Sequence, residues 1–360
     1  MAPALHDAQL DIDSGPDDPH GGWLPRYGSA AMRTYVARVL GAERTALAPS
    51  VQALASYIED NDVVRRLVHA ACADGLASSN GQAAHAGSVP GARIKDLDAD
   101  LGALLHGLNT VLTHAPGFID GELIGLPFSA FLADTGRTAG GAALFGHPTF
   151  SLLMSNILSD WHAFLDSPAS NVGFRIEGEQ WLAPEAKERY RFPVWKKDAG
   201  TPPYWNSWNA FLTRPFAHPG QARRVVARNA HGTVIFPADG APVRRDACRS
   251  GRTRCAPAEL LASPLPQQQA LIDEQRLVDL FDGGQVFQAS LGPYHVQRWW
   301  APVNGEVLFD PFVIPGSFFA QLVAPDAGGA TDSLAGSGHA RGVIVIRTEG
   351  HGHVCCIPWA

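Results

Sequence analysis

His351, His353 and Cys355 have the alternating spacing of metal ligands on a β-strand. Residues two apart on a strand project to the same face, so two imidazoles and a thiol would share it. Zinc prefers these groups and is usually held by four ligands. The sequence shows no further ligand cluster, and the adjacent Cys356 suits a buried apolar strand. We therefore predict a core strand here and no metal.

Asp239 and His295 carry a carboxylate and an imidazole, two groups that can take part in proton transfer. Asp239 lies in the sequence Pro-Ala-Asp-Gly, and an aspartate before a glycine is also a common turn residue. His295 follows Pro293 and Tyr294, which equally suits a histidine on a surface loop. The residues alone leave both interpretations open.

Four motifs, taken in order, resemble the phosphatidylserine decarboxylase superfamily. They are YWNSWNAFLTRP at residues 204–215, PADG at 237–240, RWWAPVNG at 298–305 and IPGSFF at 314–319. The N-terminal region, which opens on GWL at residues 22–24, resembles the extra domain of the L-tryptophan decarboxylases in this superfamily. The resemblance covers nearly the whole chain.

This resemblance implies a self-made cofactor. In the family, a serine in a Gly-Ser step breaks the chain through an ester and becomes a pyruvoyl group, which serves as the electron sink for decarboxylation of an amine substrate. An aspartate and a histidine beside the serine assist the cleavage, as in a serine-protease triad. The implied substrate is a small molecule with an amine, either an aromatic amino acid or phosphatidylserine.

The histidines of the family motif are replaced in this chain. Asp239 matches the family aspartate, whereas the two histidines of Tyr-His-Arg-x-His fall on Gln297 and Trp300. Neither an amide nor an indole can act as a general base near neutral pH. His295 is the local substitute, because on a strand it would share the face of Gln297, roughly 6.6 Å along. The candidate site residues are Asp239, His295, Gln297 and Trp300.

The serine that should become the pyruvoyl group is missing from its family position. Residues 352–358 match the start of a family stretch that precedes this serine, and the sequence ends at Ala360. Gly-Ser steps occur only in other contexts, at residues 28–29, 87–88, 316–317 and 336–337. We expect a truncated proenzyme, or else a degenerate homologue that binds a small amine or a partner protein. In both cases no pyruvoyl group can form from the chain as given.

Tryptophan and arginine residues allow further interpretations. The pairs Trp205/Trp208 and Trp299/Trp300 could line an aromatic pocket, but large aromatic side chains more often pack in a core, and we favour packing. Arg214, Arg223 and Arg224 could bind a carboxylate or a phosphate, or could lie in a solvated basic turn.

Two kinds of structure must position these residues. Apolar residues recur at helical spacing at 29–40, 54–58, 64–71, 94–112 and 148–165, whereas residues 73–92 lack periodicity and are assigned no fold. Beyond residue 198, β-prone runs occur at 233–236, 307–309, 343–346 and 354–357, with a long loop at 326–338.

The fold class is therefore α+β. We predict a disordered or extended N-terminus at 1–28, a helical L-tryptophan-decarboxylase-like domain at 29–197, and an incomplete phosphatidylserine-decarboxylase-like β-rich domain at 198–360 whose C-terminal part is missing.

The composition narrows the class of partner. With 28 Lys+Arg against 35 Asp+Glu, the net charge of -7 leaves no basic excess for nucleic acid. Residues 1–20 do not fit a signal peptide, and no run approaches the roughly 18 apolar residues of a membrane span. Together with five widely spaced cysteines, this predicts a cytoplasmic protein with reduced thiols and a small-molecule partner. The oligomeric state is not predicted.

Overall fold

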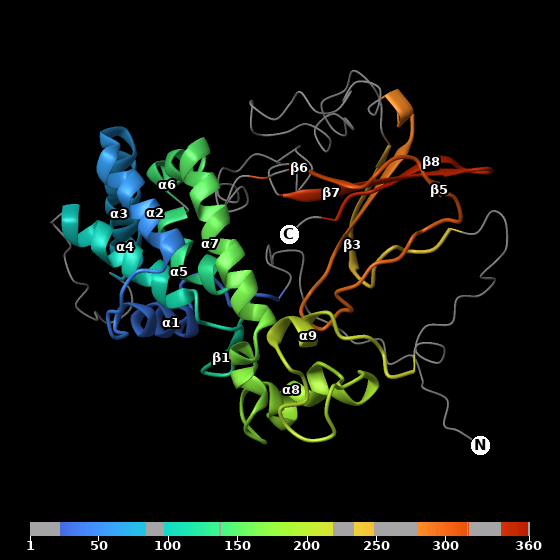
Figure 1. Ribbon diagram of the computed structural model, residues 1–360, viewed down its shortest axis with the longest axis horizontal. Helices are drawn as coiled ribbons and strands as arrows, with labels where there is room; N and C mark the ends of the chain where they lie inside the picture. Colours follow the sequence, from blue (N-terminus) through green and yellow to red (C-terminus); the bar gives the residue numbers. More distant parts are fainter. Residues whose placement is uncertain are drawn as a thin grey trace.

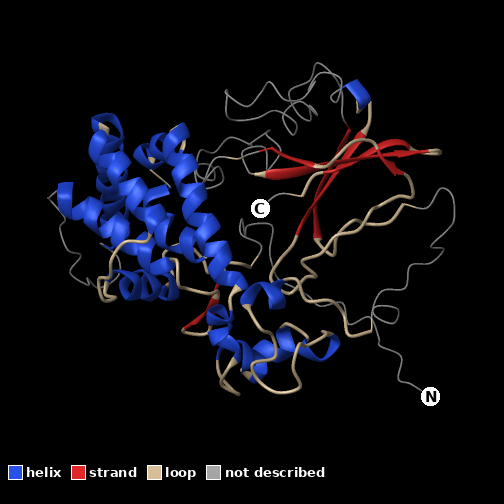
Figure 2. Cartoon of the chain, in the orientation of Figure 1, coloured by secondary structure: helices blue, strands red, loops and turns tan. Residues whose placement is uncertain are grey.

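The fold is α+β, as predicted, and the helices and the main strands gather in separate parts of the molecule (Figure 1, Figure 2). The computed structural model describes residues 22–83, 97–136, 138–218, 234–247, 279–281, 283–314, 316 and 340–358. None of the helices in these ranges is long and apolar enough to cross a membrane.

The N-terminal part consists of amphipathic helices and one short hairpin. Its elements are α1 (Ala30–Leu40), α2 (Pro49–Asp60), α3 (Asp62–Ala83), α4 (Leu97–Val111), β1 (Gly117–Ile119), β2 (Glu122–Ile124), α5 (Pro127–Gly136), α6 (Ala139–Phe145) and α7 (Pro148–Asp166). Ser29 caps α1 because its Oγ accepts a hydrogen bond from the Met32 N–H at 3.2 Å. Pro148 occupies the first turn of α7, a position that needs no N–H donor. The predicted helices at these positions are confirmed.

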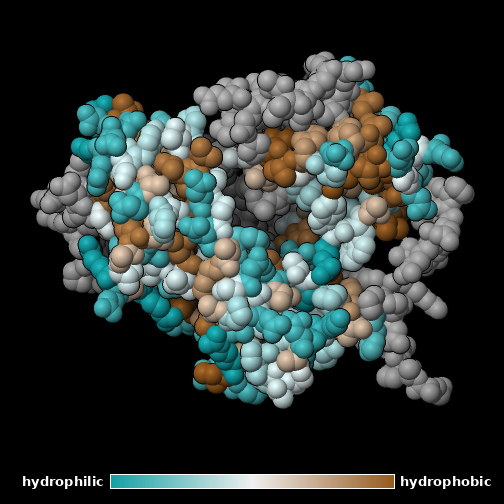
Figure 3. Space-filling model, viewed as in Figure 1, coloured by the Kyte–Doolittle hydropathy of each residue, from teal (hydrophilic) through white to brown (hydrophobic). Residues whose placement is uncertain are grey.

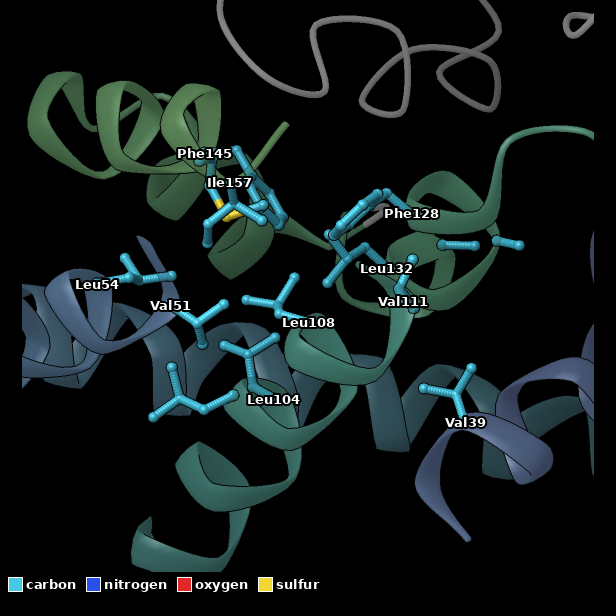
Figure 4. Packing of buried hydrophobic residues seen from close by; sticks show 14 of the residues in the cluster. Val39, Val51, Leu54, Leu104, Leu108, Val111, Phe128, Leu132, Phe145 and Ile157 are labelled. Atoms are coloured by element: carbon cyan, nitrogen blue, oxygen red, sulfur yellow. The ribbon is translucent and has the colours of Figure 1, made fainter. Parts of the chain in front are cut away.

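A continuous apolar core holds these helices together, and Figure 4 shows part of it. Leu54 of α2, Leu108 of α4 and Ile157 of α7 have no exposed surface. Each belongs to a stripe of apolar residues at helical spacing, so the periodicity in the sequence corresponds to the buried face.

Helix α3 extends further than the sequence predicts. It continues to Ala83, whereas residues 73–92 are assigned no fold from the sequence. Its first turns are anchored by packing: Val64 and Val68 are buried, and Gly140 of α6 comes so close that an added Cβ would lie 2.6 Å from the Ala71 nitrogen. An anchored helix adds one hydrogen bond for each further residue and can therefore continue through weak helix formers such as Gly75 and Gly81. Residues 84–92 lie outside the described residues.

A second core is mainly aromatic. It is formed by α8 (Pro184–Arg189), α9 (Trp208–Leu212) and the 3-10 helices η1 (Pro168–Phe174), η2 (Gln180–Leu182) and η3 (Phe192–Val194). The ring of Phe211 lies 5.0 Å from that of Trp181 and 4.9 Å from that of Trp205, centroid to centroid. The predicted boundary at residue 198 therefore falls inside one packed core, and the division into two domains stays a prediction.

Antiparallel strands make up the remainder of the described fold. Strands β3 (Ala241–Ala247) and β4 (Gln285–Ser290) form a pair, and β7 (Arg341–Thr348) pairs with β5 (Glu306–Val307), β6 (Phe312–Ile314) and β8 (Gly352–Cys356). On the face shown in Figure 3, hydrophobic residues gather over this strand-bearing part.

Two of the four strand predictions are confirmed. The runs at 343–346 and 354–357 correspond to β7 and β8. Residues 234–236 belong to no strand, and only Val307 of the run at 307–309 belongs to one, so these two predictions are wrong wholly or in part. The loop predicted at 326–338 lies outside the described residues.

Candidate functional site

The pairing of β3 with β4 brings the Asp239 segment to the start of the motif segment, which we define as residues 291–302. Ala241 at the start of β3 pairs with Ser290 at the end of β4. Gly240 makes this approach possible, because an added Cβ would lie 2.8 Å from the Ser290 carbonyl oxygen. A glycine is therefore needed after Asp239, because the backbone packs closely against β4 at this position.

A second set of backbone hydrogen bonds brings Trp300 beside the Asp239 segment. The Trp300 N–H donates to the Pro237 carbonyl at 2.7 Å, and Ala238 pairs with Trp299 in an antiparallel bridge. Asp239 itself is half-buried. Two of the predicted site residues, Asp239 and Trp300, therefore lie where residues 237–239 and 299–300 meet, a place that we call the chain crossing. The two residues are 61 positions apart in the sequence.

His295 lies in a turn, and the sequence-based placement on a strand is wrong. The His295 N–H donates to the Gly292 carbonyl at 3.0 Å, and the Gly292 N–H lies 2.7 Å from His295 Nδ1. Because Nδ1 accepts this bond, a neutral His295 carries its proton on Nε2. The lone pair of His295 is therefore engaged by the backbone, and while the turn persists it does not serve as a base.

Gln297 closes the same turn with its side-chain amide. Its Nε2 donates to the Gly292 carbonyl at 2.7 Å and approaches the His295 carbonyl at 3.4 Å. Gln297 thus contributes donors to the backbone, a structural task that an amide performs well and that involves no proton transfer.

The two tryptophan pairs have different environments. Trp205 and Trp208 are 1% and 2% exposed, which confirms the prediction that they pack in a core. Trp299 and Trp300 are 45% and 42% exposed, so the packing prediction is wrong for this pair. Trp299 and Trp300 thus present exposed indole surface on the segment that pairs with the Asp239 segment.

Arg214 lies neither in a solvated turn nor against an anion among the described residues. Its side chain is 1% exposed, and its guanidinium carbon lies 4.4 Å from the Trp195 ring centroid and 4.3 Å from that of Phe211. Nη1 donates to the Phe211 carbonyl at 3.0 Å, and Nη2 donates to the Pro293 carbonyl at 3.3 Å. Nothing in the sequence around Arg214 signals this burial. Arg223 and Arg224 lie outside the described residues.

His351, His353 and Cys355 do not form a metal-binding cluster. In the described ranges, no three His, Cys, Asp or Glu side chains converge. Cys356 is buried at the end of β8, as expected for a core strand. Burial and the neighbouring Cys356 raise the pKa of Cys355 to about 12, so its thiol stays protonated and unreactive at neutral pH.

These features define the class of protein: an α+β chain in which a Pro-Ala-Asp-Gly step crosses an Arg-Trp-Trp-Ala-Pro segment beside a helical N-terminal region. Two family profiles described as phosphatidylserine decarboxylase match the chain, one at residues 48–190 and the other at residues 208–360. The chain belongs to the phosphatidylserine decarboxylase superfamily. The first match includes the helical region, as the resemblance to the L-tryptophan decarboxylase branch implies.

A curated relative is a decarboxylase by name. The chain is 25% identical over 214 residues to "Decarboxylase iboD" of Amanita muscaria (strain Koide BX008), a match that covers 57% of this chain and 59% of that protein. The chain thus matches less than two thirds of the length of this relative.

The superfamily depends on a pyruvoyl group, and the described residues do not fit the way in which the family makes it. Asp239 is present, but the two positions where the motif comparison predicts histidines are occupied by Gln297, which is bonded to the turn, and Trp300. Among the Gly-Ser steps, only that of Ser29 lies entirely within the described residues, and its hydroxyl caps α1.

Proposed function

We propose that this protein is a phosphatidylserine decarboxylase family member that binds a small amine substrate or its analogue but does not generate a pyruvoyl group by the family's self-cleavage. The observation that carries the proposal is the Gln297 amide, which occupies a family histidine position and donates to the Gly292 carbonyl.

The argument against self-cleavage is one of proton transfer. A serine hydroxyl becomes a useful nucleophile only when a base removes its proton. Gln297 and Trp300 have no basic nitrogen, and the Nδ1 lone pair of His295 accepts the Gly292 N–H. Asp239 alone could orient an imidazole, which neither family position supplies.

The argument for amine binding rests on the groups at the chain crossing. Asp239 offers a carboxylate to a protonated amine, and the exposed rings of Trp299 and Trp300 offer π faces that attract cations. An aromatic amino acid and phosphatidylserine both carry an amine beside a carboxylate. The helical N-terminal region favours the free aromatic amino acid, by resemblance to the L-tryptophan decarboxylase branch.

The retention of Asp239 favours a second candidate function, the family reaction itself. In that case a pyruvoyl group would supply the electron sink for decarboxylation. Asp239 would then act on the amine end of the substrate and hold it beside the reacting centre.

Binding and turnover can be measured on the same preparation. We expect tryptamine or L-tryptophan to bind by calorimetry, without release of labelled carbon dioxide from carboxyl-labelled L-tryptophan. Asp239→Asn should weaken binding at least tenfold, whereas Asp166→Asn, at an exposed helix end, should not. Binding to phosphatidylserine vesicles and not to phosphatidylcholine vesicles would identify the lipid as the ligand. Carbon dioxide release would overturn the proposal, and so would failure of all three ligands to bind.

A further inference from the structure

Arg214 is a buried cation without a carboxylate partner among the described residues. Its side chain is 1% exposed, and burial lowers its pKa to about 9. The guanidinium therefore stays charged at neutral pH, although it has lost most of its hydration. Buried charges usually persist in proteins only where other groups compensate them.

The compensating groups connect two distant parts of the chain. The aromatic faces of Trp195 and Phe211 and the Phe211 carbonyl belong to the second core, whereas the Pro293 carbonyl belongs to the motif segment. The planar guanidinium can satisfy both carbonyls at once because its donors diverge from one rigid fork. The cation thus joins the motif segment to the aromatic core.

Neighbouring hydrogen bonds reinforce the same connection. Arg298 Nε donates to the Thr213 carbonyl at 2.6 Å, and Trp23 Nε1 donates to the Leu291 carbonyl at 2.8 Å. The segment is therefore attached at its beginning, within its turn and at its end. Arg214 makes the only one of these three contacts that is fully buried in the described structure.

The surroundings of Arg214 include the buried hydroxyl group of Tyr190. Arg214 Nε and the Tyr190 hydroxyl are both buried and have no hydrogen-bond partner among the described groups. Each group affects the pKa of the other, which indicates that they are neighbours. A lysine in this place would carry a single ammonium group and could not reproduce the two diverging bonds.

We propose that Arg214 is a positioning residue for the candidate site, whose guanidinium fixes the Gly292–Gln297 turn against the aromatic core and so sets the approach of Trp299 and Trp300 to Asp239. The proposal concerns the same site as the proposed function, but its test needs neither a ligand nor turnover.

Hydrogen–deuterium exchange of the full chain tests this role. We expect Arg214→Met to raise the exchange rate of the Gly292 and His295 amides at least tenfold while α7 remains protected. Arg214→Lys should restore the protection only in part. The matched control is Phe150→Leu, which disturbs the first core, where Phe150 is 1% exposed, and should leave the turn protected.

Two results would overturn the proposal. One is unchanged exchange of the turn in Arg214→Met, and the other is a parallel increase in the turn and in α7, which would mean that Arg214 only stabilises the fold as a whole. If Arg214→Met does not fold, Arg214→Lys compared with Trp23→Phe decides the matter. The lysine variant should then expose the turn more than the loss of the Trp23 bond does, and the reverse order would contradict the proposal.

Discussion

The side-chain amide of Gln297 donates a hydrogen bond to the carbonyl of Gly292, with 2.7 Å between nitrogen and oxygen. Gln297 is therefore part of a turn and contributes to its stability. We expect Gln297→Ala to lower the free energy of unfolding by about 1 kcal/mol, because one hydrogen bond to the backbone is lost. Urea unfolding measures this change. Gln52→Ala, at an exposed position of α2, is the control and should change stability by less than about 0.5 kcal/mol. Equal effects would contradict the structural role of Gln297.

Gly240 allows the Asp239 segment to approach the end of β4. An added methyl group would lie 2.8 Å from the Ser290 carbonyl oxygen and 3.1 Å from Ala289 Cβ. We expect Gly240→Ala to destabilise the protein by about 1–3 kcal/mol through overpacking. Gly200→Ala is the matched control, since no atom lies within 4 Å of its ideal Cβ. Thermal unfolding should separate the two variants, and similar melting temperatures would refute the close approach.

His114 should make the stability of the helical part depend on pH. Burial and the charge of Arg38 lower its pKa below 6.5, so the folded chain binds a proton at His114 less readily than the unfolded chain. Its contribution is therefore present above pH 6.5 and is lost as the pH falls below that value. We expect His114→Asn to reduce the loss of stability between about pH 7.5 and 5, measured by urea unfolding. Gln52→Ala, which removes no titratable group at an exposed position of α2, should leave the dependence unchanged. An unaltered pH profile in His114→Asn would contradict this assignment.

Cys355 should react slowly with alkylating reagents in the folded protein. Its pKa of about 12, against an ordinary value of 9.0, reduces the thiolate fraction roughly a thousandfold at pH 8. Iodoacetamide labelling followed by peptide mass spectrometry should show modification of Cys355 only after unfolding in urea. Rapid labelling of the native chain would show that the pKa of this thiol is not raised.

Helices α1, α2, α3, α4 and α7 could be predicted because their signals are local, whereas α5, α6 and the β1–β2 hairpin were not predicted. Ser29 and Pro148 mark helix starts by their own chemistry, and the apolar stripes of α2, α4 and α7 coincide with the first core. Strand β3 could not be predicted in this way. Arg244, Arg245 and Asp246 interrupt its apolar pattern, and its pairing with β4 is a long-range property.

The site could be predicted only as far as the motifs extend. The family motifs alone assign Asp239, Gln297 and Trp300 to one site. The sequence offered a loop as one interpretation of His295 but could not exclude a strand, because a histidine that accepts a backbone hydrogen bond has the same sequence signature as one on a strand. The burial of Arg214 could not be foreseen, since it depends on aromatic side chains and a carbonyl contributed by separate segments.

The absence of self-cleavage is tested most directly by the intact mass of the purified protein, before and after treatment with borohydride in the presence of tryptamine. We predict one uncleaved chain of 38.4 kDa with no trapped carbonyl group. Two fragments, one of which gains the mass of the reduced amine adduct, would show that a pyruvoyl group forms despite Gln297 and Trp300. That result would contradict the central claim.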